Sequence, residues 1–285
     1  AHYRNRSSNQ LVGIPLPGTT GFAVVTANLD ATVENTGWEF ELNSSIVETE
    51  NFRWSTSLNL TLPKNKLISF PNLEGSTYAN QYVIGQALDI QRVYHYTGMN
   101  PETGIYEFED YDGDGAITAA NDREKIISTT PEFFGGWQNN IRFKNWELDF
   151  LFQFVKQVGR NYYSFTSLPG VGNNLPKDFM DAWQAPGDSN MIQPYTVGFN
   201  TEVAQAHDKF KNSDAAYSDA SFIRLKNISL SYTLPKWIES ADRRVYLQAQ
   251  NLLTLTGYKG VDPEYPSFST LPPLRIISVG IDLSF

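Results

Sequence analysis

The stretch "RIISVGIDLSF" (Arg275–Phe285) decides the fold, because its side chains alternate strictly between apolar and polar. One face would carry Arg275, Ile277, Val279, Ile281, Leu283 and Phe285, and the other Ile276, Ser278, Gly280, Asp282 and Ser284. A period of two over these residues predicts a β-strand with one apolar face. Chain ends normally fray, so a regular strand that ends on an aromatic residue indicates that neighbouring strands hold it in register.

The same alternation recurs earlier in the chain. It is clearest over 146–156, where an apolar set that begins with Trp146 alternates with Glu147, Asp149, Leu151 and Gln153. Over 221–234 the alternation places Phe222 on one face with Ile228, Leu230 and Tyr232. We predict strands over 2–12, 30–47, 52–62, 136–143, 146–156, 221–234, 243–253 and 274–285.

The connections between these strands alternate in length. Short turns are predicted at 48–51, 144–145 and 235–242, and long connections at 13–29, 63–135, 157–220 and 254–273. In an up-and-down antiparallel sheet successive connections fall on opposite ends, so all the long loops would gather at one rim. This asymmetry is typical of outer-membrane barrels, whereas compact soluble domains seldom carry two loops of such length.

Composition narrows the class of protein further. The chain has 285 residues, a net charge of −9 and no cysteine. The acidic balance argues against a nucleic-acid partner, and the lack of cysteine excludes disulfides and a thiol nucleophile. No run of apolar residues is long enough for a transmembrane helix. The beginning, "AHYRNRSSNQ", contains no signal peptide and reads as a strand in progress, so we expect a fragment of a longer protein.

Strand length also suits a membrane. Eleven residues, tilted by about 40°, span roughly 28 Å, close to one hydrocarbon thickness. A soluble β-sandwich or barrel has the same alternation, but its apolar face points inward to a core. Periodicity alone therefore does not distinguish a soluble domain from a membrane barrel. Trp38, Trp54 and Trp146 stand near strand ends, as in an interfacial aromatic girdle. These tryptophans, together with the alternation of long and short connections, favour a transmembrane antiparallel β-barrel.

Several longer stretches carry a family resemblance. They are "GIPLPGTTGF", "NLDATVENTGWEFELN", "NFRWSTSLNLTLPKNKLISFPNL", "YDGDGAIT", "FIRLKNISLSYTLP", "RVYLQAQNLLTLTGYKGVDPE" and "LRIISVGIDLSF". In this order they resemble the carboxy-terminal part of SusC/RagA-family TonB-dependent transporters, the nutrient importers of the Bacteroidota outer membrane.

The resemblance implies a 22-stranded barrel in the bacterial outer membrane. Residues 1–285 would supply about its last eight strands, with long extracellular loops over about 63–135 and 157–220, and the plug domain would be absent from this chain. The implied partners are a SusD-like surface lipoprotein that forms a lid, TonB through the missing amino-terminal part, the remaining barrel and plug segment, and outer-membrane lipid.

The implied function is import of bulky nutrients, mostly oligosaccharides and in some members peptides. Two alternatives stay open. One is a SusC-like barrel that acts as a structural or adaptor subunit of a larger envelope complex, and the other is a soluble glycan-binding β-domain.

One motif has the spacing of a metal site. In "DYDGDGAITAAND" (110–122), Asp110, Asp112 and Asp114 occupy positions 1, 3 and 5 of a Dx[DN]xDG loop. Ala116 would offer its carbonyl oxygen, Thr118 stands at position 9, and Asn121 replaces the expected carboxylate at position 12, so Asp122 would have to substitute. We predict a structural Ca²⁺; the alternative is a surface turn that binds no ion.

No catalytic motif is present, and we predict that the protein is not an enzyme. His2, His95 and His207 are far apart in sequence and lie in no recognised motif. His207 and Asp208 could form a dyad, although a solvated loop pair is the simpler reading.

Three aromatic residues on the long loops, Tyr94, Tyr96 and Trp183, could stack on sugar rings or pack against a lid protein. The alternative is that they fill small cores within the loops, and Trp183 matches a family motif of structural character. Barrels of this family resemble one another in ending on an aromatic residue that the insertion machinery reads. Phe285 is therefore expected to be an assembly signal.

Overall fold

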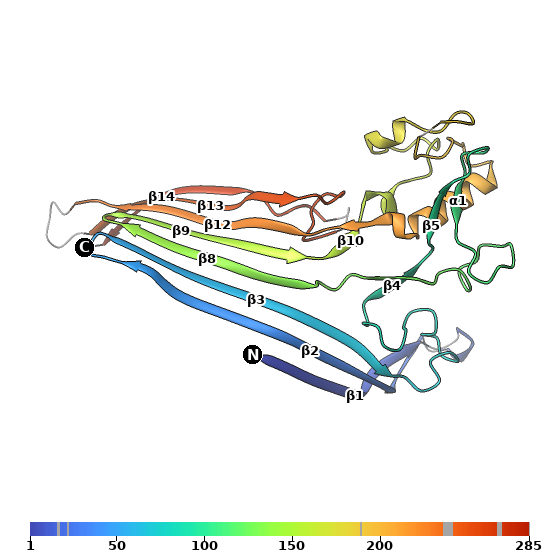
Figure 1. Cartoon of the computed structure of the whole chain (residues 1–285), viewed down its shortest axis with the longest axis horizontal. Coiled ribbons are helices and arrows are strands. Elements are labelled where there is room, and N and C mark those ends of the chain that lie inside the picture. The colour runs from blue at the N-terminus through green and yellow to red at the C-terminus, as the bar shows by residue number, and fades with distance from the viewer. Residues whose placement is uncertain (16–17, 22, 189, 236–241, 267–269, 285) are drawn as a thin grey trace.

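Eight antiparallel strands form one large sheet (Figure 1). The computed structural model describes residues 1–285 apart from 16–17, 22, 189, 236–241, 267–269 and 285, so Phe285 lies outside the described residues. The strands, in their order across the sheet, are β1 (His2–Pro15), β2 (Val24–Glu48), β3 (Phe52–Ser69), β8 (Phe133–Phe143), β9 (Trp146–Lys156), β12 (Phe222–Thr233), β13 (Asp242–Thr256) and β14 (Ile276–Ser284).

All eight predicted strands are confirmed, and neighbours in sequence are neighbours in the sheet. The long connections 70–132 and 157–221 gather at one end and the short turns at the other (Figure 1). One predicted loop is wrong. Residues 13–29 are largely strand, because β1 pairs with β2 as far as Pro15 opposite Val24. The backbone pairing of β1 with β2 therefore extends well beyond the apolar part of these two strands.

Cross-strand register builds one continuous apolar face. Near the short turns, a row across four strands consists of Tyr232, Trp146, Phe143 and Phe52, each opposite the next. The Trp146 and Tyr232 ring centroids lie 4.7 Å apart. The following rows continue this face, and we call it the apolar face: Trp38, Phe40, Leu42, Trp54, Leu58, Leu60, Leu62, Trp137, Ile141, Leu148, Phe150, Phe152, Phe154, Leu230, Leu247, Ile277, Val279 and Ile281.

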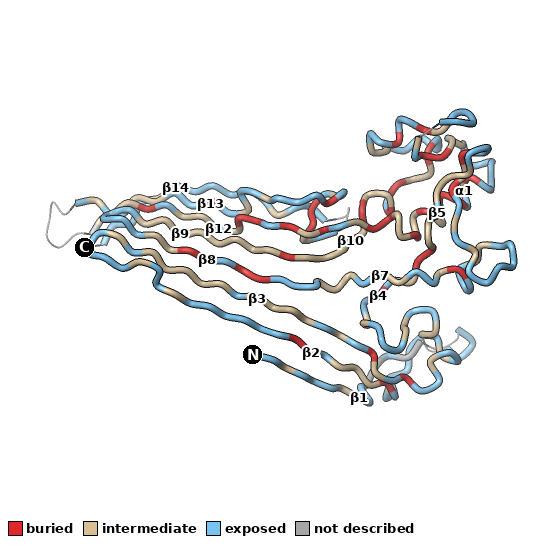
Figure 2. Tube along the Cα trace, viewed as in Figure 1, coloured by how far each residue is buried: buried red, intermediate tan, exposed pale blue. Residues whose placement is uncertain are grey.

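This face is not a core. Ile277, Val279 and Ile281 are 64%, 79% and 65% exposed, and Trp38 and Trp146 are about half exposed. Buried residues lie mainly in the loops and where the strands meet them (Figure 2). Monomeric soluble proteins rarely leave an apolar surface of this extent uncovered. The sheet therefore exposes its apolar face to its surroundings, as the wall of a membrane β-barrel does.

A bulge in β12 corrects the predicted grouping of Phe222 with Ile228. The register shifts between Leu225 and Asn227: Lys226 is an extra residue relative to β9, whereas β13 has two residues, Asn251 and Leu252, in the corresponding place. An extra residue exchanges the faces on either side of a bulge. Ile223 and Leu225 therefore share the apolar face with Ile228, whereas Phe222 turns to the other face and is buried.

The long connections fold into a cap with its own small elements. These are β4 (Ile90–Val93) paired with β7 (Lys125–Ser128), β5 (Tyr96–Met99) with β6 (Tyr106–Phe108), β10 (Val158–Arg160) with β11 (Tyr217–Asp219), and the helix α1 (Thr201–Lys211), besides short 3-10 turns at Gly18–Thr20, Tyr162–Phe165, Lys177–Met180 and Asp214–Ala216. The Asn200 side chain accepts from the backbone N–H groups of Glu202 and Val203 and caps the start of α1. No helix among the described residues is long and apolar enough to cross a membrane.

Two adjacent glycines in β8 test the close packing of the sheet. A Cβ on Gly135 would lie 2.2 Å from the Asn59 carbonyl oxygen, whereas one on Gly136 would lie 3.4 Å from its nearest neighbour, Asn59 Nδ2. We expect Gly135→Ala to destabilise the fold by about 1–3 kcal/mol, since backbone must move, and Gly136→Ala to change it by less than about 0.5 kcal/mol. Thermal unfolding of the purified full-length protein measures both. Equal melting temperatures for the two variants would contradict the packing described.

Candidate functional site

The face opposite the apolar face carries mostly polar side chains, and we call it the polar face. Within it, Asn140 donates to Glu147 at 2.8 Å and Gln138 donates to Asp149 at 3.3 Å, as expected for carboxylates on a shared hydrated surface. Most of the remaining members carry hydroxyl, amide or charged groups: Glu39, Glu41, Asn43, Ser55, Ser57, Asn59, Gln153, Ser229, Ser231, Arg244, Tyr246, Gln248, Gln250, Ser278 and Asp282.

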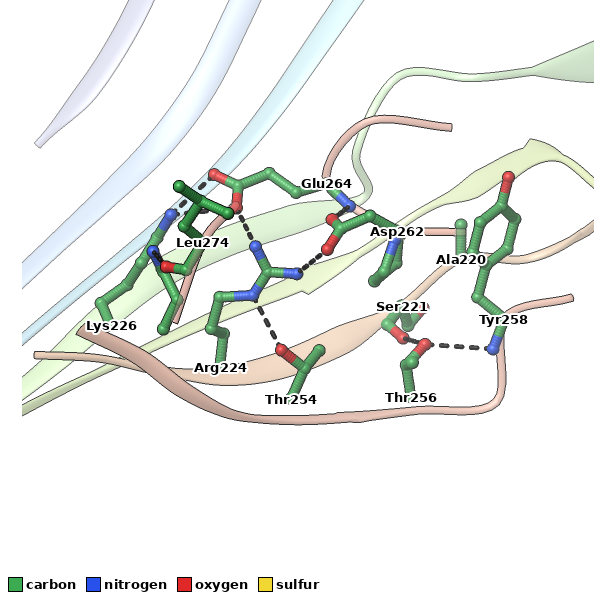
Figure 3. Close-up of polar contacts among 12 residues, drawn as sticks. Ala220, Ser221, Arg224, Lys226, Thr254, Thr256, Tyr258, Asp262, Glu264 and Leu274 are labelled. Atoms are coloured by element: carbon green, nitrogen blue, oxygen red, sulfur yellow. Dashed lines mark hydrogen bonds and ion pairs between the residues drawn. The ribbon is translucent and has the colours of Figure 1, made fainter. Parts of the chain in front are cut away.

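A buried arginine stands at the rim of the polar face. Arg224 on β12 is 1% exposed, and its guanidinium donates 2.6 Å bonds to Asp262 Oδ2 and Glu264 Oε2 (Figure 3). Its Nε donates to Thr254 Oγ1 on β13 at 2.9 Å. Burying a charge is costly unless it is paired and hydrogen-bonded, and here the guanidinium has three acceptors. The cluster therefore ties two strands to the connection that follows β13.

Further contacts extend this anchor. Lys226, the residue of the bulge, donates to both carboxylate oxygens of Glu264 at 2.9 Å (Figure 3). Gln157 donates to the Pro263 carbonyl oxygen at 2.7 Å, and the Tyr258 hydroxyl donates to the carbonyl oxygen of Arg160. The connection 257–266 is thus fixed against both β12 and the start of the 157–221 cap segment.

Our sequence analysis missed this cluster. The available signal was an arginine and a lysine that interrupt the alternation in "FIRLKN", together with an Asp-x-Glu triplet in the connection after β13. Without the bulge neither cation could be assigned to the polar face.

The structure brings together three of the carboxylates in the predicted metal-binding loop. Carboxylate oxygens of Asp110, Asp112 and Asp122 lie within 4.8 Å of one another, and Asp122 is fully buried. Asp122, and not Asn121, belongs to this group, and Asn121 donates to Asp112 Oδ2 at 2.5 Å. Asp114 is not a member of this group, and its Oδ1 accepts from the Ala116 N–H at 2.7 Å.

Backbone N–H groups organise the same loop. Asp110 accepts from Gly115 and Gly113, at 2.9 and 2.8 Å, and these bonds, led by Gly115, lower the pKa of its carboxyl. Asp122 accepts from Tyr111 and Thr118 at 2.8 and 2.6 Å. Each oxygen keeps a free lone pair. Three ionised carboxylates at this separation fit a hard divalent cation such as Ca²⁺, with Ala116 and Thr118 on the same turn as further oxygen donors.

The loop aromatics lie in small cores. Tyr94 is 4% exposed, with the Arg123 guanidinium 4.9 Å from its ring centroid. Tyr96 packs edge-on against Phe210 at 5.2 Å, and burial raises the pKa of its phenol to about 12. Trp183 covers Gly104, where a Cβ would lie 2.3 Å from the indole. All three rings thus contact other cap residues, while Tyr96 and Trp183 stay partly exposed, and contact with a ligand or lid protein stays a prediction.

The histidines form no catalytic arrangement among the described residues. His207 is buried on α1 with one ring nitrogen, Nε2, 3.2 Å from the Thr166 carbonyl oxygen, and burial lowers its pKa. The expected solvated pair with Asp208 is wrong for His207, which is a core residue. His95 Nδ1 lies 2.5 Å from Asp214 Oδ2, a pairing that sequence spacing did not predict.

Known proteins share both the sequence and the fold. The chain is 29% identical over its whole length to TonB-dependent receptor P3 of Formosa agariphila and 24% identical to TonB-dependent receptor SusC of Bacteroides thetaiotaomicron, covering 32% and 29% of those proteins. The resemblance to SusC-like TonB-dependent receptors is confirmed. The chain spans about a third of the length of these curated relatives. No protein-family model matches it.

Solved structures support the fold. The whole chain aligns with a third of a chain in "Structure of the RagAB peptide transporter" at a TM-score of 0.78 and 24% identity, and with the "open-open" state of the RagAB peptide importer at 0.73 and 23%. The antiparallel sheet therefore has the fold of the matching third of that chain. The names of these relatives describe receptors and importers, in agreement with the prediction that the protein is not an enzyme.

Removing the buried guanidinium tests its anchoring role. We expect Arg224→Leu to destabilise the contact between β12 and the connection 257–266 by about 3–5 kcal/mol, because the carboxylates of Asp262 and Glu264 would be left with too few cations. Hydrogen–deuterium exchange of residues 257–266 in the purified full-length protein should then become faster.

The matched control is Arg244→Leu, on the same sheet. Arg244 pairs with Asp282 at 2.8 Å, but both side chains are about half exposed, so its loss should cost at most about 1 kcal/mol. Unchanged exchange over 257–266 in Arg224→Leu would show that the cluster does not hold this connection.

Proposed function

We propose that the chain is part of an outer-membrane barrel that imports bulky nutrients by a TonB-dependent mechanism. The observation that carries the proposal is the inside-out sheet, whose apolar face is exposed and whose polar face is lined with hydroxyl, amide and charged groups. Such a wall separates lipid from a hydrated lumen. The relatives named above support the coupling to TonB.

Closure of the barrel needs more strands than these eight. β1 and β14 are the two edges of the sheet and do not pair with each other among the described residues. Unpaired backbone groups are not tolerated in hydrocarbon. We infer that the remaining strands of a 22-stranded barrel, together with a plug domain, complete the wall and provide the contact with TonB.

The cargo we propose is an oligosaccharide, with a peptide as the other candidate because of the RagAB likeness. A polar face rich in amides and hydroxyls suits the many hydroxyl groups of a glycan. The proposed partner is a SusD-like surface lipoprotein that closes over the cap. Exposed apolar side chains in the cap support this, since Phe199 is 90% exposed and Met191 and Val197 are mostly exposed, and exposed apolar surface is typical of sites that meet another protein.

We propose further that Ca²⁺ binds the loop 110–122 as a structural ion. The supporting observation is the approach of three carboxylates, Asp110, Asp112 and Asp122, on an otherwise open turn. The ion would relieve their mutual repulsion and stiffen a connection of more than sixty residues, 70–132.

Neighbouring residues on β14 test the orientation of the wall. We expect Val279→Lys to lower the amount of folded protein in the outer membrane, because a lysine on the lipid side costs about 2–4 kcal/mol near the bilayer centre. Ser278→Lys, which points to the polar face, should leave the level unchanged. Quantitative membrane fractionation with heat-modifiable gel mobility measures both variants. Equal levels for both, or extraction without detergent, would refute the membrane position.

Uptake of a labelled oligosaccharide tests the transport function. Deletion of the gene should abolish uptake, and the wild-type gene should restore it. Uptake that survives deletion while other envelope proteins fail to assemble would favour the structural or adaptor role instead.

Terbium luminescence tests the cation site. Tyr111 stands between Asp110 and Asp112 in the sequence, and its backbone N–H donates to Asp122, so bound Tb³⁺ should show sensitised emission that excess Ca²⁺ reverses. Asp110→Asn/Asp112→Asn should abolish this emission, whereas Glu102→Gln/Asp181→Asn removes two charges from the same cap and should preserve it. Emission that is equal in the two double variants would show that the aspartates bind no ion.

A further inference from the structure

The outward side of β1–β3 becomes cationic directly beyond the apolar face. The last apolar row consists of His2, Trp38 and Leu62, which stand opposite one another on the three strands. The next two rows on this same side are Arg4, Thr36 and Lys64, then Arg6, Glu34 and Lys66. Arg4, Arg6, Lys64 and Lys66, which we call the cationic rows, thus sit together on a chain whose net charge is −9.

The inner side of the same stretch carries no charge. Its three rows are Tyr3, Gly37 and Pro63, then Asn5, Asn35 and Asn65, then Ser7, Val33 and Leu67. If the charges served only to hydrate strands that project into water, either side could carry them. Their restriction to the outward side indicates a partner outside the wall.

Two of the four cations lack a counterion. Glu34 Oε2 is shared by Arg4 Nε at 2.7 Å and Arg6 Nε at 2.5 Å. Lys64 and Lys66 are exposed, and neither has a carboxylate of the described residues within 4.0 Å. The cationic rows therefore keep a positive charge that an anionic ligand can meet.

A notch of about 620 Å³ opens beside the two lysines. It forms because β3 pairs with β8 only as far as Thr61, after which Leu67 exchanges backbone bonds with Gly85 and Gln86 instead. Its lining includes Leu62 and Phe133 as well as Lys64, Lys66, Glu34 and Glu132. The notch is thus apolar on the side of the apolar face, and above it two lysines and two glutamates line it.

We propose that the cationic rows and this notch bind the phosphate-bearing headgroup of a glycolipid of the outer leaflet, with its acyl chains against the apolar face. The inference rests on the proposed membrane position. Neighbouring strands are about 4.8 Å apart and alternate residues about 7 Å apart, so phosphates can be reached by more than one cation. Basic side chains at a membrane surface recognise anionic headgroups, and the apolar lower part of the notch matches a lipid better than a free anion.

The test uses the purified full-length protein in detergent with a fluorescent bisphosphorylated glycolipid, and the same lipid after removal of its phosphates. We expect the phosphorylated lipid to bind several-fold more tightly, with an affinity that falls as salt rises. Lys64→Gln/Lys66→Gln should weaken its binding by about tenfold or more, at about 1 kcal/mol for each lysine. Both side chains are exposed and unpaired, so the variant should fold.

The control is Lys125→Gln/Lys177→Gln, which removes two exposed lysines from the cap and should bind like the wild type. Equal affinity for the dephosphorylated lipid, an unchanged affinity in Lys64→Gln/Lys66→Gln, or competition by inorganic phosphate at lipid-like concentrations would each overturn the proposal. Binding in detergent is measured independently of uptake, so failure here leaves the transport function standing, and the reverse also holds.

Discussion

The structure depends on one constraint, which is that a strand in contact with hydrocarbon must have every backbone N–H and C=O group paired along a ladder. The ladder fixes a period of two, so each strand has one side chain for lipid and the next for water. The rows from Tyr232 through Trp146 and Phe143 to Phe52 show how register converts this local rule into a continuous face. Because the wall has no core of its own, buried residues lie mainly in the cap and at its junction with the strands.

The sequence predicted the sheet well because the signal was local. Alternation in segments such as 146–156 and 276–284 follows directly from the pleat, and loop lengths then placed the cap at one end. The errors arose where a single backbone irregularity changed parity. The bulge at Lys226 moved Phe222 to the polar face, and no residue type in "FIRLKN" identifies a bulge. The pairing of β1 with β2 beyond 12 was missed because those residues alternate weakly.

The candidate site was less predictable than the fold, for a physical reason. The aspartate loop could be picked out because its candidate carboxylates lie within thirteen residues, and the structure brings three of them, Asp110, Asp112 and Asp122, together. The Arg224 cluster joins residues about forty positions apart across three segments, so only the folded chain reveals it. Similarly, the aromatic rings of Tyr94, Tyr96 and Trp183 could serve a ligand or a loop core, and only the folded chain reveals their contacts with other cap residues.

The two charged clusters at the junction of wall and cap have different physical consequences. Arg224 is buried, and the carboxylates of Asp262 and Glu264 compensate its charge within the protein. Its effect is to fix the connection 257–266 against β12. Lys64 and Lys66 stand on the opposite side of the wall at the same end, beside Glu34 and Glu132, and neither has a carboxylate of the described residues within 4.0 Å. A charge that is compensated internally restrains conformation, whereas one that is left uncompensated next to an apolar surface attracts an amphipathic ligand. Both follow from the same alternation, which sends one residue of each pair inward and its neighbour toward the membrane.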